Sequence, residues 1–306
     1  MKPRITVIGS SNTDMVIQLD RIPHPGETLL GGEFVMAPGG KGANQAVAAA
    51  RAGGNICFVA KVGKDLFGEQ TLHNLKRDKI DVRHISRDPA APSGVALIFV
   101  ARNGENSIAV ASGANAQLSP EDILRARSII KASSLLVMQL ETPQKTVEAA
   151  ASLALRFGVR VILNPAPAVR LSRALLKQVS ILTPNETEAQ LLTGIRADSQ
   201  VTAAKAAQKL HAQGVETVVL TLGSKGAYVS APGCRSLVPG FKVKAVDTTA
   251  AGDVFNGALA VALSEDRPLL ESVRFASAAA AISVTRMGAQ PSAPRRKEID
   301  QFLRQV

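Results

Sequence analysis

The feature that most constrains the fold of this 306-residue chain is the alternation of strand-length apolar runs with helix-length amphipathic segments. Such alternation predicts βαβ units, because two parallel strands need a long crossover connection, which is usually a helix. We therefore expect an α/β fold, a three-layer sandwich in which helices flank a mostly parallel central sheet. The expected strands are residues 5–8, 56–60, 95–100, 135–140, 159–163, 180–183, 217–221 and 227–230. The expected helices are residues 43–51, 68–76, 120–130, 147–157, 186–192, 201–213, 253–263 and 269–285.

Two segments interrupt this alternation. Residues 18–36 are rich in proline and glycine, and residues 93–111 hold two β-rich pieces separated by Asn103-Gly104, a hairpin signal. Together they are expected to form a small antiparallel β flap over the sheet edge, although two ordinary surface hairpins are an alternative. The chain shows no internal repeat, linker or domain boundary. We therefore expect a single α/β domain over residues 1–306, with insertions at about 15–37 and 93–112.

The bulk properties narrow the functional class. The net charge of +11 is compatible with nucleic-acid binding, but aromatic residues make up only 3% of the chain and tryptophan is absent, so stacking platforms are scarce. We interpret the charge as solubility with some attraction for a polyanionic nucleotide. No apolar run reaches the roughly 18 residues of a membrane span. Cys57 and Cys234 are expected to be reduced thiols, and a cytoplasmic location is expected by default.

Three common motifs fail. A Walker A loop ending at Lys41 needs glycine at 35 and serine or threonine at 42, but the chain has Val35 and Gly42. A dinucleotide fingerprint starting at Gly40 needs a small residue where Gln45 stands. No G-x-S-x-G elbow occurs. These motifs therefore support neither a P-loop NTPase, nor a dinucleotide enzyme, nor acyl transfer by a nucleophile elbow.

Four polar stretches lie at expected strand ends or helix starts. In the first, SNTD at 11–14, Asp14 suits a bidentate hydrogen bond to a vicinal diol, and simple capping of a turn is an equal alternative. The second is GGKGANQA at 39–46, whose glycines favour close backbone approach. There Asn44 is placed to exchange hydrogen bonds with sugar hydroxyls, whereas Lys41 alone is more often solvated.

The third stretch is TPNETE at 183–188. Asn185 and Glu188 fit a capping box, and the functional alternative is a hydrated Mg²⁺ near this helix face. The fourth is DTTAAGDVFNG at 247–257, preceded by TLGSKG at 221–226. Small residues at a helix start leave N–H groups free for an anion, with Asp253 beside them to take a proton. A tight turn with an acidic residue suited to the helix dipole is the simpler interpretation.

Taken together, these stretches resemble the signatures of the ribokinase-like carbohydrate kinases. GGKGANQA, TPNETE and DTTAAGDVFNGAL (247–259) carry the resemblance, which runs from the first strand to GAQPS at 288–292. Within that family the glycine-rich octet and the Ala-Ala-Gly-Asp sequence look like those of the ribose-directed members. The resemblance implies a kinase that transfers the γ-phosphoryl group of ATP to O5 of D-ribose.

The resemblance also implies residue roles. Asp253 is expected to be the general base, beside an anion hole formed by the backbone amides of Ala250, Ala251 and Gly252. The sugar site is expected to contain Asn12, Asp14, Gly40, Lys41, Asn44, Glu141 and Asp253. The nucleotide site is expected to contain Asn185, Thr221, Gly223, Ser224, Gly226, Gly252 and Ser277. Glu188 is expected to organise Mg²⁺ through water. A monovalent cation, usually K⁺, is expected near Asp247, Thr249, Ser283, Arg286, Gly288 and Ser292.

The resemblance has small departures and leaves alternatives open. Val254 stands where these kinases often carry threonine, and Ser277 stands where a larger polar residue is common. The flap corresponds to the family's β-lid, which implies a homodimer paired through the lid. The expected partners are a small-molecule sugar and a nucleotide, with no nucleic acid and no membrane. The alternatives are another acceptor (deoxyribose, another pentose, a ketohexose or a nucleoside), a binding module without catalysis, and a nucleic-acid binder.

Overall fold

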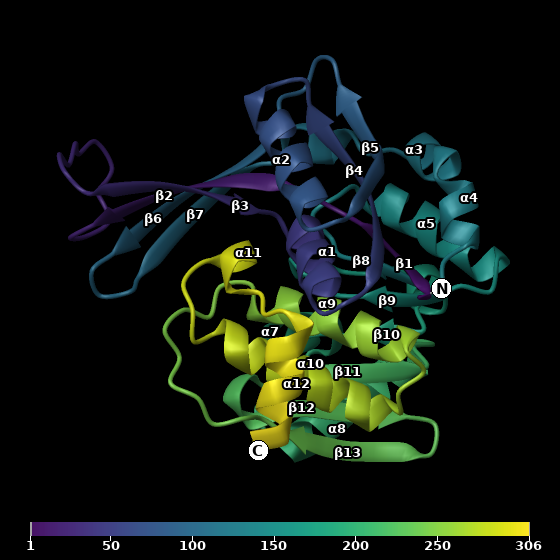
Figure 1. The fold of residues 1–306 in the computed structure, drawn as a ribbon. Helices are drawn as coiled ribbons and strands as arrows, with labels where there is room; N and C mark the ends of the chain where they lie inside the picture. The colour runs from purple at the N-terminus through teal and green to yellow at the C-terminus, as the bar shows by residue number, and fades with distance from the viewer. Residues whose placement is uncertain (1, 306) are drawn as a thin grey trace.

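The computed structural model describes residues 2–305 and is built on one large sheet. Its strands are β1 (Arg4–Ile8), β4 (Asn55–Gly63), β5 (Asp81–Asp88), β8 (Leu135–Met138), β9 (Arg160–Leu163), β10 (Ile181–Leu182), β11 (Thr217–Thr221), β12 (Gly226–Ala231) and β13 (Cys234–Pro239). Their order is β13-β12-β11-β10-β9-β8-β1-β4-β5 (Figure 1). The pairs from β11 to β5 are parallel, and β12 and β13 are added antiparallel at one edge. The expected mostly parallel sheet is confirmed.

Helices cover both faces of this sheet and bury a separate core on each. One face carries α1 (Lys41–Arg51), α2 (Leu66–Arg77), α9 (Ala251–Ser264), α10 (Leu269–Ser283) and α12 (Arg296–Gln305). The other carries α3 (Pro120–Arg125), α4 (Arg127–Lys131), α5 (Gln144–Arg156), α6 (Arg173–Leu176), α7 (Glu186–Thr193) and α8 (Gln200–Ala212). Successive strand residues alternate between the cores: Leu135 packs in the first and Leu136 in the second. Because both faces are buried, the strands read as continuous apolar runs.

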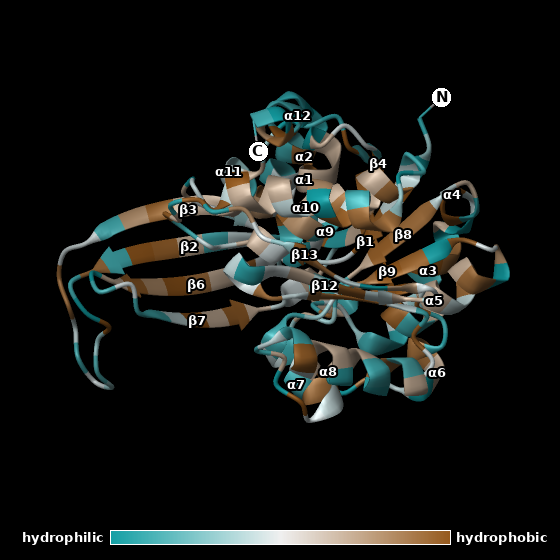
Figure 2. Cartoon of the chain, turned by 90° about the horizontal axis from the view of Figure 1, so that it is seen from below, coloured by the Kyte–Doolittle hydropathy of each residue, from teal (hydrophilic) through white to brown (hydrophobic). Residues whose placement is uncertain are grey.

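A second sheet, of four strands, projects from the body (Figure 1). It consists of β2 (Asn12–Leu19), β3 (Glu33–Gly39), β6 (Gly94–Ala101) and β7 (Asn106–Ala111), in the order β3-β2-β6-β7. Both hairpins are antiparallel as expected, but the central pair, β2 and β6, is parallel because the two insertions leave the body in the same direction. Apolar residues run along all four strands (Figure 2). Those with large exposed side chains are Phe34, Val35, Met36, Leu97, Ile108 and Val110.

Some element boundaries differ from the sequence-based expectation. The expected helix over 120–130 is interrupted at Ala126, where ψ is 5° and α3 gives way to α4. Strands β5 and β13 were not expected, since β5 is rich in charged residues and β13 ends in proline. Short helices α6 and α11 (Ala289–Ser292) also escaped the pattern. Within residues 2–305, no helix combines the length and apolar character needed to cross a membrane.

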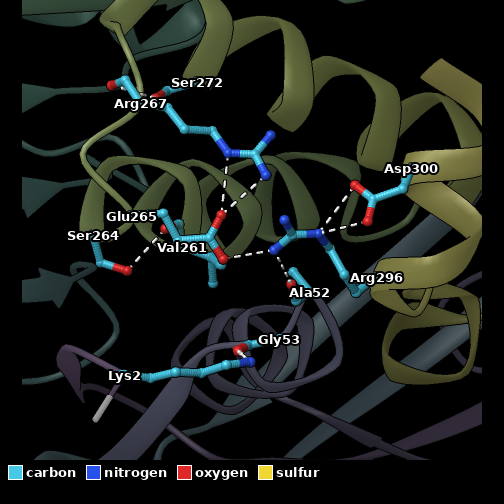
Figure 3. A network of polar contacts seen from close by, with 10 residues as sticks. All are labelled: Lys2, Ala52, Gly53, Val261, Ser264, Glu265, Arg267, Ser272, Arg296 and Asp300. Carbon is cyan, nitrogen blue, oxygen red and sulfur yellow. Dashed lines mark hydrogen bonds and ion pairs between the residues drawn. The ribbon is translucent and has the colours of Figure 1, made fainter. Parts of the chain in front are cut away.

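Residues near both ends of the described chain contact the C-terminal end of α1 (Figure 3). Arg296 of α12 pairs with Glu265, which follows α9, at 2.6 Å, and its Nη1 donates to the carbonyl of Ala52 at 3.4 Å. Lys2 Nζ donates to the carbonyl of Gly53 at 2.8 Å. These contacts hold the C-terminal end of α1, the helix whose N-terminal end carries the GGKGANQA stretch.

Candidate active site

The polar stretches singled out in the sequence gather at the carboxyl ends of the parallel strands. Residues 9–12 follow β1, Gln139 and Glu141 follow β8, Asn164 follows β9, and Thr183 follows β10. The chain order reverses between β1 and β8, because β4 and β5 extend the sheet one way and β9 to β11 the other. Open α/β sheets bind ligands in the crevice at such a switch point. A hydrogen bond from Ser10 Oγ to Glu141 Oε2 (2.5 Å) spans it.

The glycines of the GGKGANQA stretch let α1 begin directly against β1 and β2. Gly40, the N-cap of α1, has φ of 85°, and a Cβ there would lie 2.7 Å from the backbone nitrogen of Asn12. A Cβ on Gly42 would lie 2.6 Å from the carbonyl carbon of Gly9. The close approach expected here is therefore an approach of the chain to itself, which brings the first turn of α1 up to the strand ends.

The expected sugar-site residues lie around this junction. Glu141 Oε2 also accepts from the backbone amide of Lys41 at 2.9 Å, and the half-buried Asp14 lies on β2. The Oδ1 atom of Asn12 accepts from Asn115 Nδ2 at 2.8 Å. Asn115 also bonds both backbone polar groups of Ser11, so it fixes the root of the second sheet. The sequence reasoning missed Asn115, which lies in a short turn with no motif around it.

Asp253 lies at the centre of the site. It is 5% exposed in the first turn of α9, and both its oxygens are held: Gln45 Nε2 donates to Oδ1 and Asn44 Nδ2 to Oδ2, each at 3.0 Å. The chain reaches α9 through Ala250, a non-glycine residue with φ of 58°. Asn44 Oδ1 is buried and has no partner among the described residues, so it remains available to a ligand hydroxyl.

Burial and neighbouring carboxylates set the charges of the site. Burial, then Glu141, then Asp253 raise the pKa of Asp14 to about 6. Burial also raises the pKa of Asp253, against the opposing effects of Lys41, Gln45 and Asn44. Burial lowers the pKa of Lys41, but the facing carboxylates of Asp253, Glu141 and Glu188 outweigh it and raise the pKa. Several carboxyl groups thus surround the ammonium group of Lys41, and the pKa values of Asp14, Asp253 and Lys41 are shifted in the way that is common at functional sites.

The start of α9 presents free backbone donors beside Asp253. The amide of Ala251 donates to the carbonyl of Thr248 at 3.2 Å and is thus engaged within the turn. Among residues 2–305, the amides of Ala250 and Gly252 have no hydrogen-bond acceptor. Gly252 is exposed, and a Cβ there would meet nothing within 4 Å. Of the three amides expected to form an anion hole, those of Ala250 and Gly252 are therefore open in this structure, and their role toward an anion remains a prediction.

The expected nucleotide-side residues fall into two linked turns and one helix. Asn185 and Glu188 form the capping box of α7, with Glu188 Oε2 accepting from the Asn185 amide at 2.9 Å. The amide of Thr221 donates to the carbonyl of Pro184 at 3.0 Å, which joins the two turns. Gly223 and Gly226 have φ of 55° and 103° in the turn that holds the exposed Ser224. Ser277 is buried in α10, and no hydrogen bond within the described residues joins it to these turns.

Asp247 joins two of the other residues expected around a monovalent cation. Its Oδ1 accepts from the amide of Thr249 at 2.9 Å and its Oδ2 from the amide of Gly288 at 2.8 Å. The amide of Arg286 donates to the carbonyl of Ser283 in the same connection, and Ser292 is buried in α11. These bonds hold the loop before α9 against the segment after α10.

The comparisons with known proteins agree with this geometry. The model of the pfkB family of carbohydrate kinases matches residues 2–296. The chain belongs to this family. It is 48% identical over 303 residues to a ribokinase of Haemophilus influenzae, with 99% of each chain covered, and 39% identical to a deoxyribokinase of Salmonella typhi, with 98% of each covered. As a pfkB-family kinase it also superposes on Arabidopsis thaliana ribokinase, solved with ribose and ATP, with a TM-score of 0.92, 32% identity and 99% of each chain covered.

The sequence reasoning missed three buried amides behind this kinase site. Gln45 was noted only because it breaks a dinucleotide fingerprint, and Gln139 and Asn164 follow β8 and β9 without any motif. The available signal was position: a polar side chain directly after a buried strand, or on the buried face of an alanine-rich helix, needs a partner. The identity of the partner required the fold.

Proposed function

We propose that the chain is an ATP-dependent ribokinase that transfers the γ-phosphoryl group of ATP to O5 of D-ribose. The observation that carries this proposal is Asp253, a buried carboxylate beside the open amide of Gly252, in a chain 48% identical to a ribokinase over nearly its full length. The relatives named above act on ribose or deoxyribose by their names, so both are candidate acceptors. Asp14 favours ribose, because a carboxylate accepts two hydrogen bonds from a vicinal diol.

The proposed mechanism assigns one task to each group. Asp253 accepts the proton of the attacking sugar hydroxyl, while Asn44 Oδ1 accepts a hydrogen bond from the sugar and keeps it in line. The free amides at the start of α9 stabilise the charge on the phosphoryl oxygens, and they do so without reorganisation because the helix fixes them. Lys41 balances the nearby carboxylates. Phosphoryl transfer depends mainly on such positioning and charge stabilisation.

We propose that Glu188 contributes to Mg²⁺ binding through water. Both its oxygens are engaged with Asn185, Oε2 with the backbone amide at 2.9 Å and Oε1 with Nδ2 at 3.0 Å. Within the described residues, no group of three or more His, Cys, Asp or Glu side chains is placed to hold a metal ion. This donor set fits an ion that keeps its waters and binds chiefly through phosphate oxygens. When bound, such an ion neutralises phosphate charge.

We propose that a monovalent cation such as K⁺ binds beside the start of α9. The support is Asp247, whose two amide contacts close a loop against the segment holding Ser283, Arg286 and Gly288. Backbone oxygens in closely packed turns are suitable ligands for a hard cation. Burial raises the pKa of the Asp247 carboxyl, but the Thr249 side chain and the amides of Thr249 and Gly288 outweigh it and lower the pKa, so this carboxylate supplies the negative charge.

We also propose a cytoplasmic homodimer paired through the second sheet. The exposed apolar side chains of this sheet, such as Leu97, Ile108 and Val110, are each about half exposed and support this pairing. Leu97→Glu and Ile108→Glu should convert the dimer to a monomer in light scattering. A wild-type protein that is monomeric at micromolar concentration would contradict the pairing.

The decisive experiment measures ADP release with ATP and Mg²⁺ over a panel of sugars, with and without K⁺. Ribose should give the highest kcat/KM, and omission of K⁺ should lower the rate. A higher kcat/KM for a ketohexose or a nucleoside would contradict the assignment of ribose as the acceptor. Absence of ADP release with every sugar would refute the proposed kinase activity. Phosphate found at a carbon other than C5 would refute the assignment of the attacking hydroxyl.

A further inference from the structure

A row of buried amide side chains lies behind the candidate base. Gln45 on α1 is fully buried, and its Nε2 donates both to Asp253 Oδ1 at 3.0 Å and to Asn164 Oδ1 at 3.1 Å. Its Oε1 accepts from Gln139 Nε2 at 2.7 Å, and Gln139 is fully buried as well. Three separate elements thus meet through amides directly beneath the carboxylate.

The row has a fixed direction. A glutamine amide has one acceptor oxygen and one donor nitrogen, and the oxygen of Gln45 is already occupied by Gln139. Asn164 is oriented in turn, because its Nδ2 donates to the carbonyl of Thr183 at 3.2 Å. The nitrogen of Gln45 must therefore face Asp253. Since Asn44 holds the other oxygen, two amides define the plane of the carboxylate.

We propose that Gln45 is a positioning residue for the reaction, oriented by Asn164 and Gln139, and that it keeps Asp253 ionised and aligned to receive the hydroxyl proton. The inference rests on the proposed function of Asp253. Its physical basis is that a buried carboxylate deprived of donors favours its protonated form, in which it no longer accepts a proton. The charged groups that face Asp253 are Lys41 on α1, Glu141 after β8, Asp14 on β2 and Glu188 on α7.

The groups around Asp253 act on its pKa in opposite directions, and Gln45 is one of those that lower it. Burial raises the pKa of Asp253, and Glu141 acts in the same direction, while Lys41, Gln45 and Asn44 oppose them. Loss of the Gln45 donor should therefore raise the pKa of Asp253. The acidic limb of the pH–rate profile should then move to higher pH, because activity is lost as pH falls through that pKa.

The test uses Gln45→Met, which keeps the side-chain length and removes both polar atoms. We expect kcat to fall about 10- to 100-fold, in line with misalignment of a general base, while the KM for ribose changes less than about threefold. Gln139→Met leaves the contacts of Asp253 in place and should produce a smaller loss in the same direction. The matched control is Ser133→Ala, which breaks a buried 2.7 Å hydrogen bond to Thr6 at the opposite ends of the strands.

The control should lower thermal stability without moving kcat or the acidic limb. Unchanged kcat and an unmoved limb in Gln45→Met would overturn the proposal, as would an effect on the melting temperature alone. Should Gln45→Met fail to fold, Gln139→Met decides by the same criteria. Carboxyl ¹³C NMR of Asp253 separates this inference from the proposed function. Titration at higher pH in Gln45→Met supports the effect of Gln45 on Asp253 ionisation whether or not the wild type releases ADP, and equal titration refutes that effect.

Discussion

Replacing Asp253 with asparagine removes the proposed base and keeps its shape. Asp253 accepts from two amides, Gln45 Nε2 and Asn44 Nδ2, and an asparagine oxygen at this position satisfies only one of them. The structure provides a remedy, because Asn44 Oδ1 is buried without a partner among the described residues. Rotation of the Asn44 amide would place this oxygen against the new NH₂ group. The variant should therefore fold with both hydrogen bonds intact.

The expected losses follow from this rearrangement. A general base contributes about 10²–10⁴ in rate, so Asp253→Asn should lower kcat by that factor, roughly 3–5 kcal/mol. The rotated Asn44 presents a donor to the sugar where it formerly presented an acceptor. One altered hydrogen bond changes affinity by about 1 kcal/mol, so the KM for ribose should rise no more than about tenfold. Stability should hold or increase, because a carboxylate whose ionisation burial disfavours is replaced by a neutral group.

The assay combines steady-state kinetics over a ribose series with thermal unfolding. The control is Asp122→Asn, since Asp122 is equally buried, at 5% exposed, and pairs with Lys61 at 2.8 Å on the other face of the sheet. It should lose stability and keep its kcat. Turnover of Asp253→Asn within a few-fold of the wild type would remove Asp253 from its role. A large fall in its melting temperature would refute the proposed rotation of Asn44.

Three further predictions concern separate parts of the molecule. Gly252→Ala should raise stability by about 0.5–1 kcal/mol in thermal unfolding and lower kcat at least about tenfold, because the new methyl group meets no protein atom but lies in the phosphoryl path. Ribose affinity measured by calorimetry should fall below pH 6, the approximate pKa of Asp14, and Asp14→Asn should abolish this dependence. Burial raises the pKa of Glu265, but Arg296 and Arg267 outweigh burial and lower the pKa. The stability that the Glu265 carboxylate contributes is therefore present above about pH 4.5, the pKa of an unperturbed glutamate, and is lost as pH falls below it. In urea unfolding, Glu265→Gln should lower the free energy of unfolding by about 0.5–1 kcal/mol at pH 7 and make that free energy depend less on pH in the acidic range.

Sequence reasoning predicted the layers of the fold because strand and helix periods differ. Runs such as 135–138 are apolar on both faces, which is typical of a parallel strand covered by helices, and the start of α9 was evident from its small residues. Charged β5 gave no such signal, because every residue of this edge strand is half-buried or exposed, so it needs no continuous apolar run. The parallel pairing of β2 with β6 depends on how two distant insertions leave the body, which no local pattern encodes.

The candidate site divides in the same way. Asp253, Asn44 and Gly252 could be singled out because each lies in a stretch whose local sequence favours a ligand site, and their roles remain predictions. Gln45 and Asn115 were missed, because they act on other side chains across more than 70 intervening residues, and a partner at that separation is defined only once the sheet has formed. The capping box of Asn185 and Glu188 shows the converse: a local pattern predicted a structural contact correctly, and its role toward Mg²⁺ remains a prediction.

The arrangement of charge explains how one crevice can accept both substrates. The chain carries a net charge of +11, yet carboxylates from Asp14, Glu141 and Asp253 gather where the neutral sugar is proposed to bind. Carboxylate oxygens accept hydrogen bonds from the hydroxyl groups of a sugar, but their negative charge repels phosphate. The repulsion is offset by Lys41 and by the free amide of Gly252, one residue before the base. Because the proposed proton acceptor, Asp253, and the proposed anion donor, Gly252, are consecutive in the first turn of α9, the helix backbone fixes the spacing between them.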